Sequence, residues 1–265
     1  MAHIVQLVPK QKLFLFPQQE KLANDLINLL SIFTESEAKI RPHFHLTGPS
    51  GSGKSYLLKQ ICEAMKVPMI EVNAAGITAE GLSGNSLSKA IRKLREHWNE
   101  PNVIFVDEFD KLFQRNGSST EDFRSGVQDE FLTCLESKYA SVFTDYGKYE
   151  PTVIENSLFV FAGAYSNQRI NNLKGLRDAG MRTEFVGRVP LVFESLEVPL
   201  HELKKYIPEV ALFKEYRKLF KEGRDSHHVA KIIQIMNEQD KESKIGIRLM
   251  NSAIHQHFLG QKDDH

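Results

Sequence analysis

The chain has 265 residues with 34 basic and 34 acidic side chains, so its formal net charge at neutral pH is zero. A neutral total excludes a global field that would draw the protein to nucleic acid or to an anionic membrane. Hydrophobic residues make up 41% of the chain, as in ordinary globular proteins, yet no apolar run approaches the roughly 20 residues of a membrane span. Because the N-terminal residues also lack the layout of a signal peptide, we expect a cytoplasmic protein without a membrane partner.

Helices and strands are predicted to alternate from residue 17 to about residue 193. Helical spacing of apolar residues identifies the helices, and continuous apolar runs identify strands that are covered on both faces. Such alternation is typical of an α/β fold with a parallel sheet and helical crossovers. In chain order we expect helix 17–33, strand 43–47, helix 53–65, strand 68–73, loop 76–84, helix 87–98, strand 102–106, loop 114–126, helix 127–135, an irregular segment or hairpin over 139–156, strand 158–163 and strand 189–193.

No strand is predicted after Pro199. Three helical stretches follow, over about 201–221, around 229–236 and around 247–258, where apolar residues recur at helical spacing. We therefore predict an α/β domain over residues 1–198 and a small helical subdomain over residues 199–265.

The cysteines and histidines indicate packing rather than a metal site. Cys62 and Cys134 lie on the predicted buried faces of helices, which favours core packing over a disulfide. The pairs His227-His228 and His255-x-His257 have no cysteine or carboxylate at metal-ligand spacing. We interpret these histidines as surface or packing residues.

Residues 48–55 match the phosphate-binding pattern G-x-x-x-x-G-K-[ST] between a predicted strand and a predicted helix, which is the context that this motif requires. Glycines let the backbone curl so that its N–H groups point at phosphate oxygens, and the following helix adds its positive end. The lysine supplies a charge for the β- and γ-phosphates, and the hydroxyl that follows it can bind Mg²⁺. The sequence therefore predicts binding of a nucleoside triphosphate with Mg²⁺ by Gly48, Pro49, Ser50, Gly51, Ser52, Gly53, Lys54, Ser55 and the adjacent Tyr56.

Two acidic residues end the apolar run 103–106. In P-loop enzymes an aspartate at this position, here Asp107, holds the Mg²⁺. A second acid beside it, here Glu108, can orient and polarise the attacking water. This pair about fifty residues after a complete P-loop favours an enzyme that hydrolyses the nucleotide over a protein that only binds it.

The segment Asp107-Glu108-Phe109-Asp110-Lys111-Leu112 resembles the Walker B segment of AAA+ ATPases, and its D-E-h-D-K form is similar to that of the ClpX/HslU branch of protein unfoldases. Four further segments agree with that branch in order. They are the first pore-loop segment (residues 78–84), the segment after Walker B (residues 125–128), the E-F-I-G-R-L-P box (residues 184–190) and the sensor-2 motif (residues 246–248). The resemblance covers nearly the whole chain from about residue 14.

This resemblance implies a P-loop AAA+ core with a parallel sheet flanked by helices, followed by a C-terminal α-helical lid subdomain. It implies that Arg188 reaches the γ-phosphate bound by the next subunit, with Arg182 as a substitute, and that Arg248 touches the nucleotide in cis. A polar sensor-1 residue is expected after strand 158–163, at Ser166 or Asn167. The implied pore loop comprises Gly81, Leu82, Ser83 and Gly84.

The sequence departs from the family pattern in three ways. Leu82 occupies the position of the pore-loop aromatic, so it lacks the flat ring that grips varied peptides. The stretch from 164 to 182 is too short for the loop that docks a peptidase, and the pore-entrance loop is reduced to about residues 145–151. We also expect neither the zinc-binding N-terminal domain nor the large inserted domain of the branch.

The favoured hypothesis is a homo-oligomeric, hexameric ring that hydrolyses ATP to remodel or unfold a protein partner. The alternative is a nucleic-acid-associated AAA+ ATPase of the helicase-loader or transposition-regulator type. Basic residues at 89, 92, 93, 95, 204 and 205 favour that alternative, although such runs are most often solvated helix faces. A third reading is a nucleotide-dependent scaffold with slow turnover.

Overall fold

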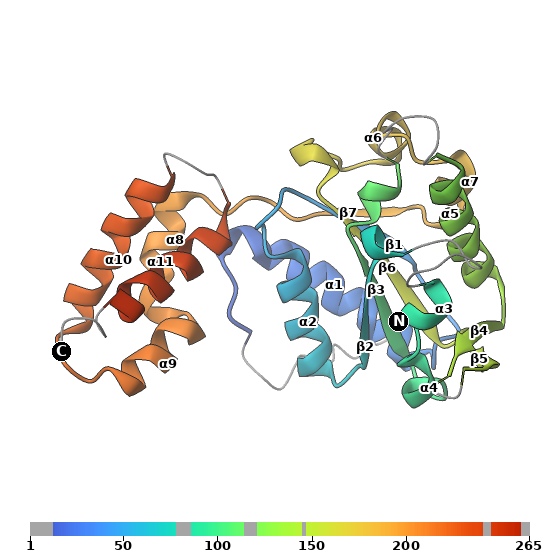
Figure 1. Ribbon diagram of the computed structural model, residues 1–265, viewed down its shortest axis with the longest axis horizontal. Coiled ribbons are helices and arrows are strands. Elements are labelled where there is room, and N and C mark those ends of the chain that lie inside the picture. The colour runs from blue at the N-terminus through green and yellow to red at the C-terminus, as the bar shows by residue number, and fades with distance from the viewer. Residues whose placement is uncertain (1–12, 78–85, 114–120, 145–146, 241–244, 261–265) are drawn as a thin grey trace, which may run out of the picture. The chain divides into compact units, whose positions relative to one another are not determined.

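The computed structural model describes residues 13–77, 86–113, 121–144, 147–240 and 245–260 (Figure 1). These residues divide into two compact units. The first unit contains residues 21–49 and 54–195. The second unit contains residues 14–20, residues 50–53 and the chain from Leu196 onward, so four residues of the P-loop belong to it.

A five-stranded parallel sheet forms the centre of the first unit, as the alternating pattern predicts. The strand order is β2-β3-β6-β1-β7, and each neighbouring pair is parallel. Every residue of β1 and β6, and all but the last residue of β3, is buried, which explains their unbroken apolar runs. The strands are β1 (Phe44–Thr47), β2 (Met69–Asn73), β3 (Asn102–Asp107), β6 (Ser157–Gly163) and β7 (Leu191–Glu194).

Helices cover both faces of this sheet (Figure 1). On one face, residues of β2, β3 and β6 share a hydrophobic core with residues of the helices α3, α4, α5, α6 and α7. Figure 1 shows α1 and α2 on the opposite side of the strands. The helices are α1 (Pro17–Glu35), α2 (Lys54–Met65), α3 (Leu87–Ala90), α4 (Leu94–His97), α5 (Glu121–Glu136), α6 (Leu173–Asp178) and α7 (Thr183–Arg188).

A separate antiparallel hairpin joins α5 to β6. It consists of β4 (Tyr139–Phe143) and β5 (Tyr149–Val153), with Phe143 opposite Tyr149. The hairpin predicted as one possibility for residues 139–156 is therefore present.

Two expected elements differ in the structure. The region 87–98 is not one helix, because a turn at residues 91–93 separates α3 from α4. Bonds between residues three apart, such as Leu94 N–H to Ile91 O, keep the apolar side chains on one side through this turn. The region 114–126 is not all loop, since α5 already begins at Glu121.

The second unit is helical and has its own hydrophobic core. Its helices are α8 (Leu200–Tyr206), α9 (Ala211–Leu219), α10 (Asp225–Asp240) and α11 (Ile247–Leu259). Fully or almost fully buried side chains, among them Phe213, Ile232, Met236 and Phe258, fill the space between these helices. None of the described helices is long and apolar enough to cross a membrane.

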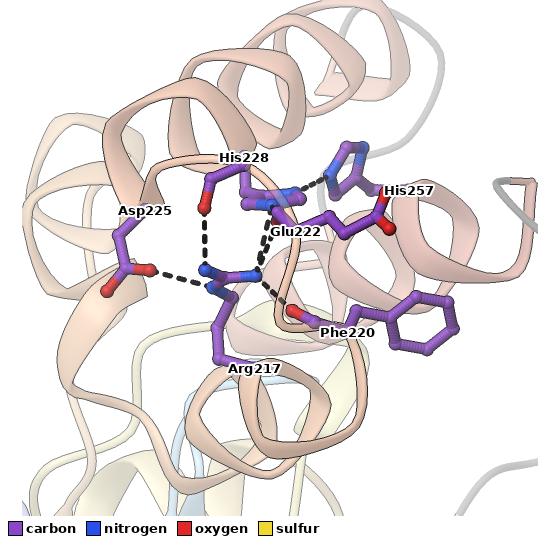
Figure 2. A network of polar contacts seen from close by, with 7 residues as sticks. Arg217, Phe220, Glu222, Asp225, His228 and His257 are labelled. Carbon is purple, nitrogen blue, oxygen red and sulfur yellow. Dashed lines mark hydrogen bonds and ion pairs between the residues drawn. The ribbon is translucent and has the colours of Figure 1, made fainter.

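Polar contacts close the loop between α9 and α10 (Figure 2). The Arg217 guanidinium contacts Asp225 at 2.7 Å and donates to the carbonyls of Phe220, Glu222 and Gly223. It thereby satisfies carbonyl groups that follow the end of a helix. Beside it, Nδ1 of His228 lies 2.8 Å from Nε2 of His257, and both rings are buried between α10 and α11. These two histidines are packing residues, one of the two roles that the sequence suggests.

Candidate functional site

The carboxyl ends of β1, β3 and β6 meet at one edge of the sheet. β6 lies between the other two strands, with Thr47 of β1 opposite Gly163 and Val106 of β3 opposite Phe161. The P-loop follows β1, the acidic pair ends β3, and the predicted sensor-1 turn follows β6. Ligands of open parallel sheets bind at such an edge. Three separate predictions from the sequence therefore fall at the expected place for a ligand site.

Close packing fixes the start of the P-loop. Gly48 has φ +138°, and a Cβ at this position would lie 2.2 Å from the carbonyl oxygen of Ser195. The Ser195 N–H donates to Thr47 O at 2.8 Å, so the segment after β7 is bonded to the end of β1. Only glycine fits this backbone, both sterically and conformationally.

The middle of the P-loop contacts residues of the helical unit. Gly51 O accepts a hydrogen bond from Ile247 N–H at 2.9 Å, and a Cβ on Gly51 would lie 2.1 Å from Ile245 O. Ser52 O accepts from the side chain of Gln19 at 3.2 Å. These contacts hold residues 51–52 against the start of α11 and the first turn of α1.

Arg248 reaches the P-loop directly. Its Nη1 donates to the Ser50 hydroxyl at 3.2 Å, and both residues belong to the helical unit. The predicted sensor-2 arginine and the phosphate-binding loop are therefore in contact.

Lys54 is buried, with 8% of its surface exposed. Its Nζ donates to the carbonyls of Gly48 at 2.6 Å and Pro49 at 3.0 Å. A buried ammonium needs such partners, and carbonyl oxygens hold it within the curve of the loop. Tyr56, two residues on, is exposed.

Ser55 and Asp107 come together across the site. The Ser55 hydroxyl donates to Asp107 Oδ2 at 3.3 Å, while Oδ1 of the same carboxylate accepts from Glu108 N–H at 2.8 Å. Glu108 has left-handed backbone angles, φ 55° and ψ 29°, and its side chain is exposed. The hydrogen bond to Asp107 helps to hold this uncommon conformation.

This pair of oxygen atoms fits a magnesium ion. Mg²⁺ prefers oxygen ligands and is typically bound through one or two carboxylates together with substrate phosphates and water. Within the described residues there is no group of three or more His, Cys, Asp or Glu that could hold a metal by itself. The hydroxyl and carboxylate thus suit an ion that arrives with a nucleotide.

The two predicted arginines of the first unit are both ion-paired. Arg188, in the last turn of α7, contacts Glu136 at the end of α5, and both side chains are about half exposed. Arg182 contacts Asp129 at 2.5 Å and Glu184 at 2.7 Å. Neither arginine contacts the P-loop of its own chain in the described structure.

Several basic side chains in the predicted patches bind groups of this chain. Arg95 contacts Glu150 at 2.7 Å, Lys205 contacts Glu202 at 2.7 Å, and Lys204 donates to Asn237 at 2.6 Å. These contacts fit the solvated helix faces that the sequence suggests for such runs.

The structure describes only part of the predicted sensor-1 and pore-loop residues. Ser166 is exposed and has left-handed backbone angles, with φ 54°. The side chain of Asn167 and the predicted pore loop, Gly81, Leu82, Ser83 and Gly84, lie outside the described residues. Sequence reasoning missed Gln19 and Glu136, whose partners lie 33 and 52 positions away, so no local pattern reveals them.

His45 lies in β1, two residues before the end of the strand. It is fully buried beside the rings of Phe109, Phe161 and Phe185, and burial lowers its pKa to about 3. The ring is therefore neutral at physiological pH and serves as a packing residue under the site.

Comparison with known proteins agrees with this geometry. A family model described as "ATPase family associated with various cellular activities (AAA)" matches residues 44–191. The ATP-dependent Clp protease ATP-binding subunit ClpX of Treponema denticola is 27% identical, over 81% of this chain and 63% of the relative. The ClpX subunits of Porphyromonas gingivalis and Borrelia duttonii are 25% and 28% identical, over 79% and 66% of this chain. The chain spans 62% and 52% of the length of these two relatives.

Proposed function

Because the chain belongs to the AAA family of ATPases, we propose that it hydrolyses ATP with Mg²⁺ as a homo-oligomeric, hexameric ring and thereby remodels or unfolds a protein partner. The family match covers the P-loop, the acidic pair and the sensor-1 turn. The observation that carries the proposal is the contact of Ser55 with Asp107, directly before the exposed Glu108.

Each residue of this edge has a distinct part in the proposed reaction. Bound MgATP supplies the γ-phosphoryl group that is transferred to water. The backbone N–H groups of residues 50–53 and the Lys54 ammonium bind the phosphate oxygens. Ser55 and Asp107 provide oxygen ligands for the cation, and Glu108 orients a water molecule and accepts its proton.

Arg188 acts across a subunit boundary in this proposal. A guanidinium directed at a transferring phosphoryl group stabilises the charge that develops there. Its half-exposed position at the end of α7, away from any described contact with its own P-loop, supports a role toward a neighbouring chain. Arg248, which donates to Ser50, would respond to the nucleotide bound by its own chain.

A protein is the proposed partner. The related subunits are named as ATP-binding parts of a Clp protease, and the sequence resembles their unfoldase branch at several motifs. Leu82 replaces the pore-loop aromatic, so we propose action on a particular partner through a few steps rather than general unfolding. The pairing of Arg95 and Lys205 with acidic residues gives no support to a nucleic-acid groove.

A trapping experiment tests this proposal. The Glu108→Gln protein, loaded with ATP, should retain a protein partner that co-purifies and is released when ATP is removed. The Lys54→Ala protein, which cannot hold nucleotide in this account, is the matched control and should retain none. Salt-dependent recovery of DNA or RNA in place of a protein would instead support the nucleic-acid-associated alternative.

A further inference from the structure

Asp110 is a buried acid close to the exposed Glu108. It lies in a short 3₁₀ turn, η2 (Phe109–Leu112), directly after Glu108, and only 3% of its surface is exposed. Its Oδ1 accepts from Ala164 N–H at 3.3 Å, and its Oδ2 accepts from Tyr165 N–H at 3.0 Å. One buried carboxylate thus bonds two successive amides more than fifty positions away.

The turn that Asp110 holds has an unusual backbone. Tyr165 and Ser166 have φ values of 48° and 54°, both in the left-handed region that disfavours residues with a side chain. Gly163 precedes them, and a Cβ there would lie 2.9 Å from Asp110 Oδ1. The carboxylate can approach this closely because residue 163 is a glycine. Its two hydrogen bonds to backbone amides in turn hold the left-handed backbone of the turn.

The same short segment carries the acidic pair of the site. Asp107 bonds Ser55 and the Glu108 amide, and Asp110 bonds the end of β6. Since β6 lies between β3 and β1, the turn at 163–166 is next to the strand that leads into the P-loop. Residues 107–110 therefore connect the end of β3 with the first turn of α2 and with the turn that follows β6.

A simple ion pair does not account for Asp110. Lys111 Nζ is 3.8 Å from Asp110 Oδ2, but the lysine side chain is 42% exposed, and such pairs are weak. The two amide donors, in contrast, point at a carboxylate removed from water. Charge-assisted hydrogen bonds of this kind are among the stronger ones in proteins.

We propose that Asp110 is a positioning residue for ATP hydrolysis, which fixes the 163–166 turn relative to Glu108. This inference rests on the proposed role of Glu108 in activating water. Loss of the two amide bonds lets the turn leave its left-handed conformation, so Glu108 and the turn after β6 no longer keep a fixed geometry. Nucleotide binding, which depends on the P-loop, is retained.

The test compares Asp110→Asn with Gln128→Leu in the full-length protein. Gln128 is also buried and donates to Leu112 O at 3.2 Å, so it is a matched control that bonds the last residue of η2 instead of the 163–166 turn. For Asp110→Asn we expect full nucleotide stoichiometry, a KM within threefold of the wild-type value, a kcat at least tenfold lower, and faster hydrogen exchange at residues 164–165. For Gln128→Leu we expect loss of stability with kcat per bound nucleotide unchanged.

The same series includes Glu108→Gln, so two failures are distinguishable. Wild-type hydrolysis by Glu108→Gln would overturn the proposed role of Glu108 itself. Loss of hydrolysis in Glu108→Gln, together with wild-type kcat in Asp110→Asn, would overturn only the inference about Asp110. A kcat that falls in proportion to nucleotide stoichiometry would also overturn it, because Asp110 would then serve stability alone.

Discussion

The hydroxyl of Ser55 donates a hydrogen bond to Asp107 Oδ2 at 3.3 Å, although 52 positions separate the two residues. This contact joins the first turn of α2 to the end of β3. Both atoms are hard oxygen donors, and a cation between them would also meet a phosphate held by the P-loop. The arrangement separates binding groups from the acid that would act on water, and the variants below exploit this separation.

Lys54→Ala should abolish measurable nucleotide binding. The ammonium now bonds the carbonyls of Gly48 and Pro49, and in the proposed function it binds phosphate oxygens. We expect affinity for ATP to fall at least about 100-fold, equivalent to about 2.7 kcal/mol. Calorimetric titration with MgATP measures this change. Lys59→Ala, which removes an exposed lysine of the same helix, is the control and should bind normally.

Gly48→Ala should destabilise the protein and weaken nucleotide binding together. The added Cβ would lie 2.2 Å from Ser195 O, at a φ that side chains disfavour, so the backbone must shift. We expect the free energy of unfolding to fall by about 2 kcal/mol or more. Gly76→Ala is the matched control, since a Cβ there meets nothing within 4 Å. Equal unfolding midpoints for the two variants in urea would contradict this account of the P-loop.

Arg188→Ala should bind ATP and hydrolyse it poorly. If its guanidinium stabilises the transferring phosphoryl group in a neighbouring subunit, its loss should lower kcat at least about 100-fold with little change in affinity. Mixing Arg188→Ala with Lys54→Ala protein should restore part of the activity. In the mixed oligomer, an intact P-loop of one chain can meet the intact arginine of the other.

Two results would contradict this role for Arg188. One is a mixture no more active than its components although the chains assemble together. The other is wild-type turnover per chain that stays constant on dilution to a demonstrated monomer. Glu136→Gln removes the ion-pair partner of Arg188 within its own chain but leaves the arginine in place. It therefore measures the effect of the ion pair alone, and it should keep more activity than Arg188→Ala.

Stability should fall as the pH is lowered from about 6.5 toward 4. Burial lowers the pKa of His45 to about 3 and the pKa values of His43 and His257 to about 4. Histidines of the unfolded state become protonated near pH 6.5, whereas these three stay neutral in the folded state until the pH is lower. Lowering the pH through this window therefore favours the unfolded state. Each such histidine then costs about 1.4 kcal/mol of stability per pH unit within that window. Urea unfolding at several pH values measures the slope.

His45→Leu isolates one contribution to this slope. Removal of the deeply buried imidazole should make stability less dependent on pH between 6.5 and 4, because unfolding then takes up about one proton fewer. An identical slope in His45→Leu and wild-type protein would show that His45 is protonated in the folded state.

The sheet and the site motifs could be predicted because their signals are local. Strands buried on both faces read as continuous apolar runs, and the P-loop and the acidic pair each occupy a few consecutive positions. The turn between α3 and α4 was not predicted, since its bonds between residues three apart keep Leu87, Ile91 and Leu94 on the buried side. The start of α5 was missed because residues 121–126 carry little apolar periodicity.

The contacts that complete the site could not be predicted from local patterns. Asp110 bonds the amide of Tyr165, 55 positions away, and Arg248 contacts Ser50, 198 positions away. Such pairs depend on which strand ends become neighbours and how the chain folds back. The local signal for Asp110 is that a further acid follows Asp107 by three positions.

The most direct measurement of the central claim is single-turnover hydrolysis of MgATP by Glu108→Gln, alongside its binding affinity. The glutamine keeps the shape of the side chain but cannot accept a proton from water. The account predicts nucleotide affinity within about threefold of wild type and hydrolysis at least about 100-fold slower. Hydrolysis at the wild-type rate by nucleotide-saturated Glu108→Gln protein would contradict the assignment of this edge of the sheet as the catalytic centre.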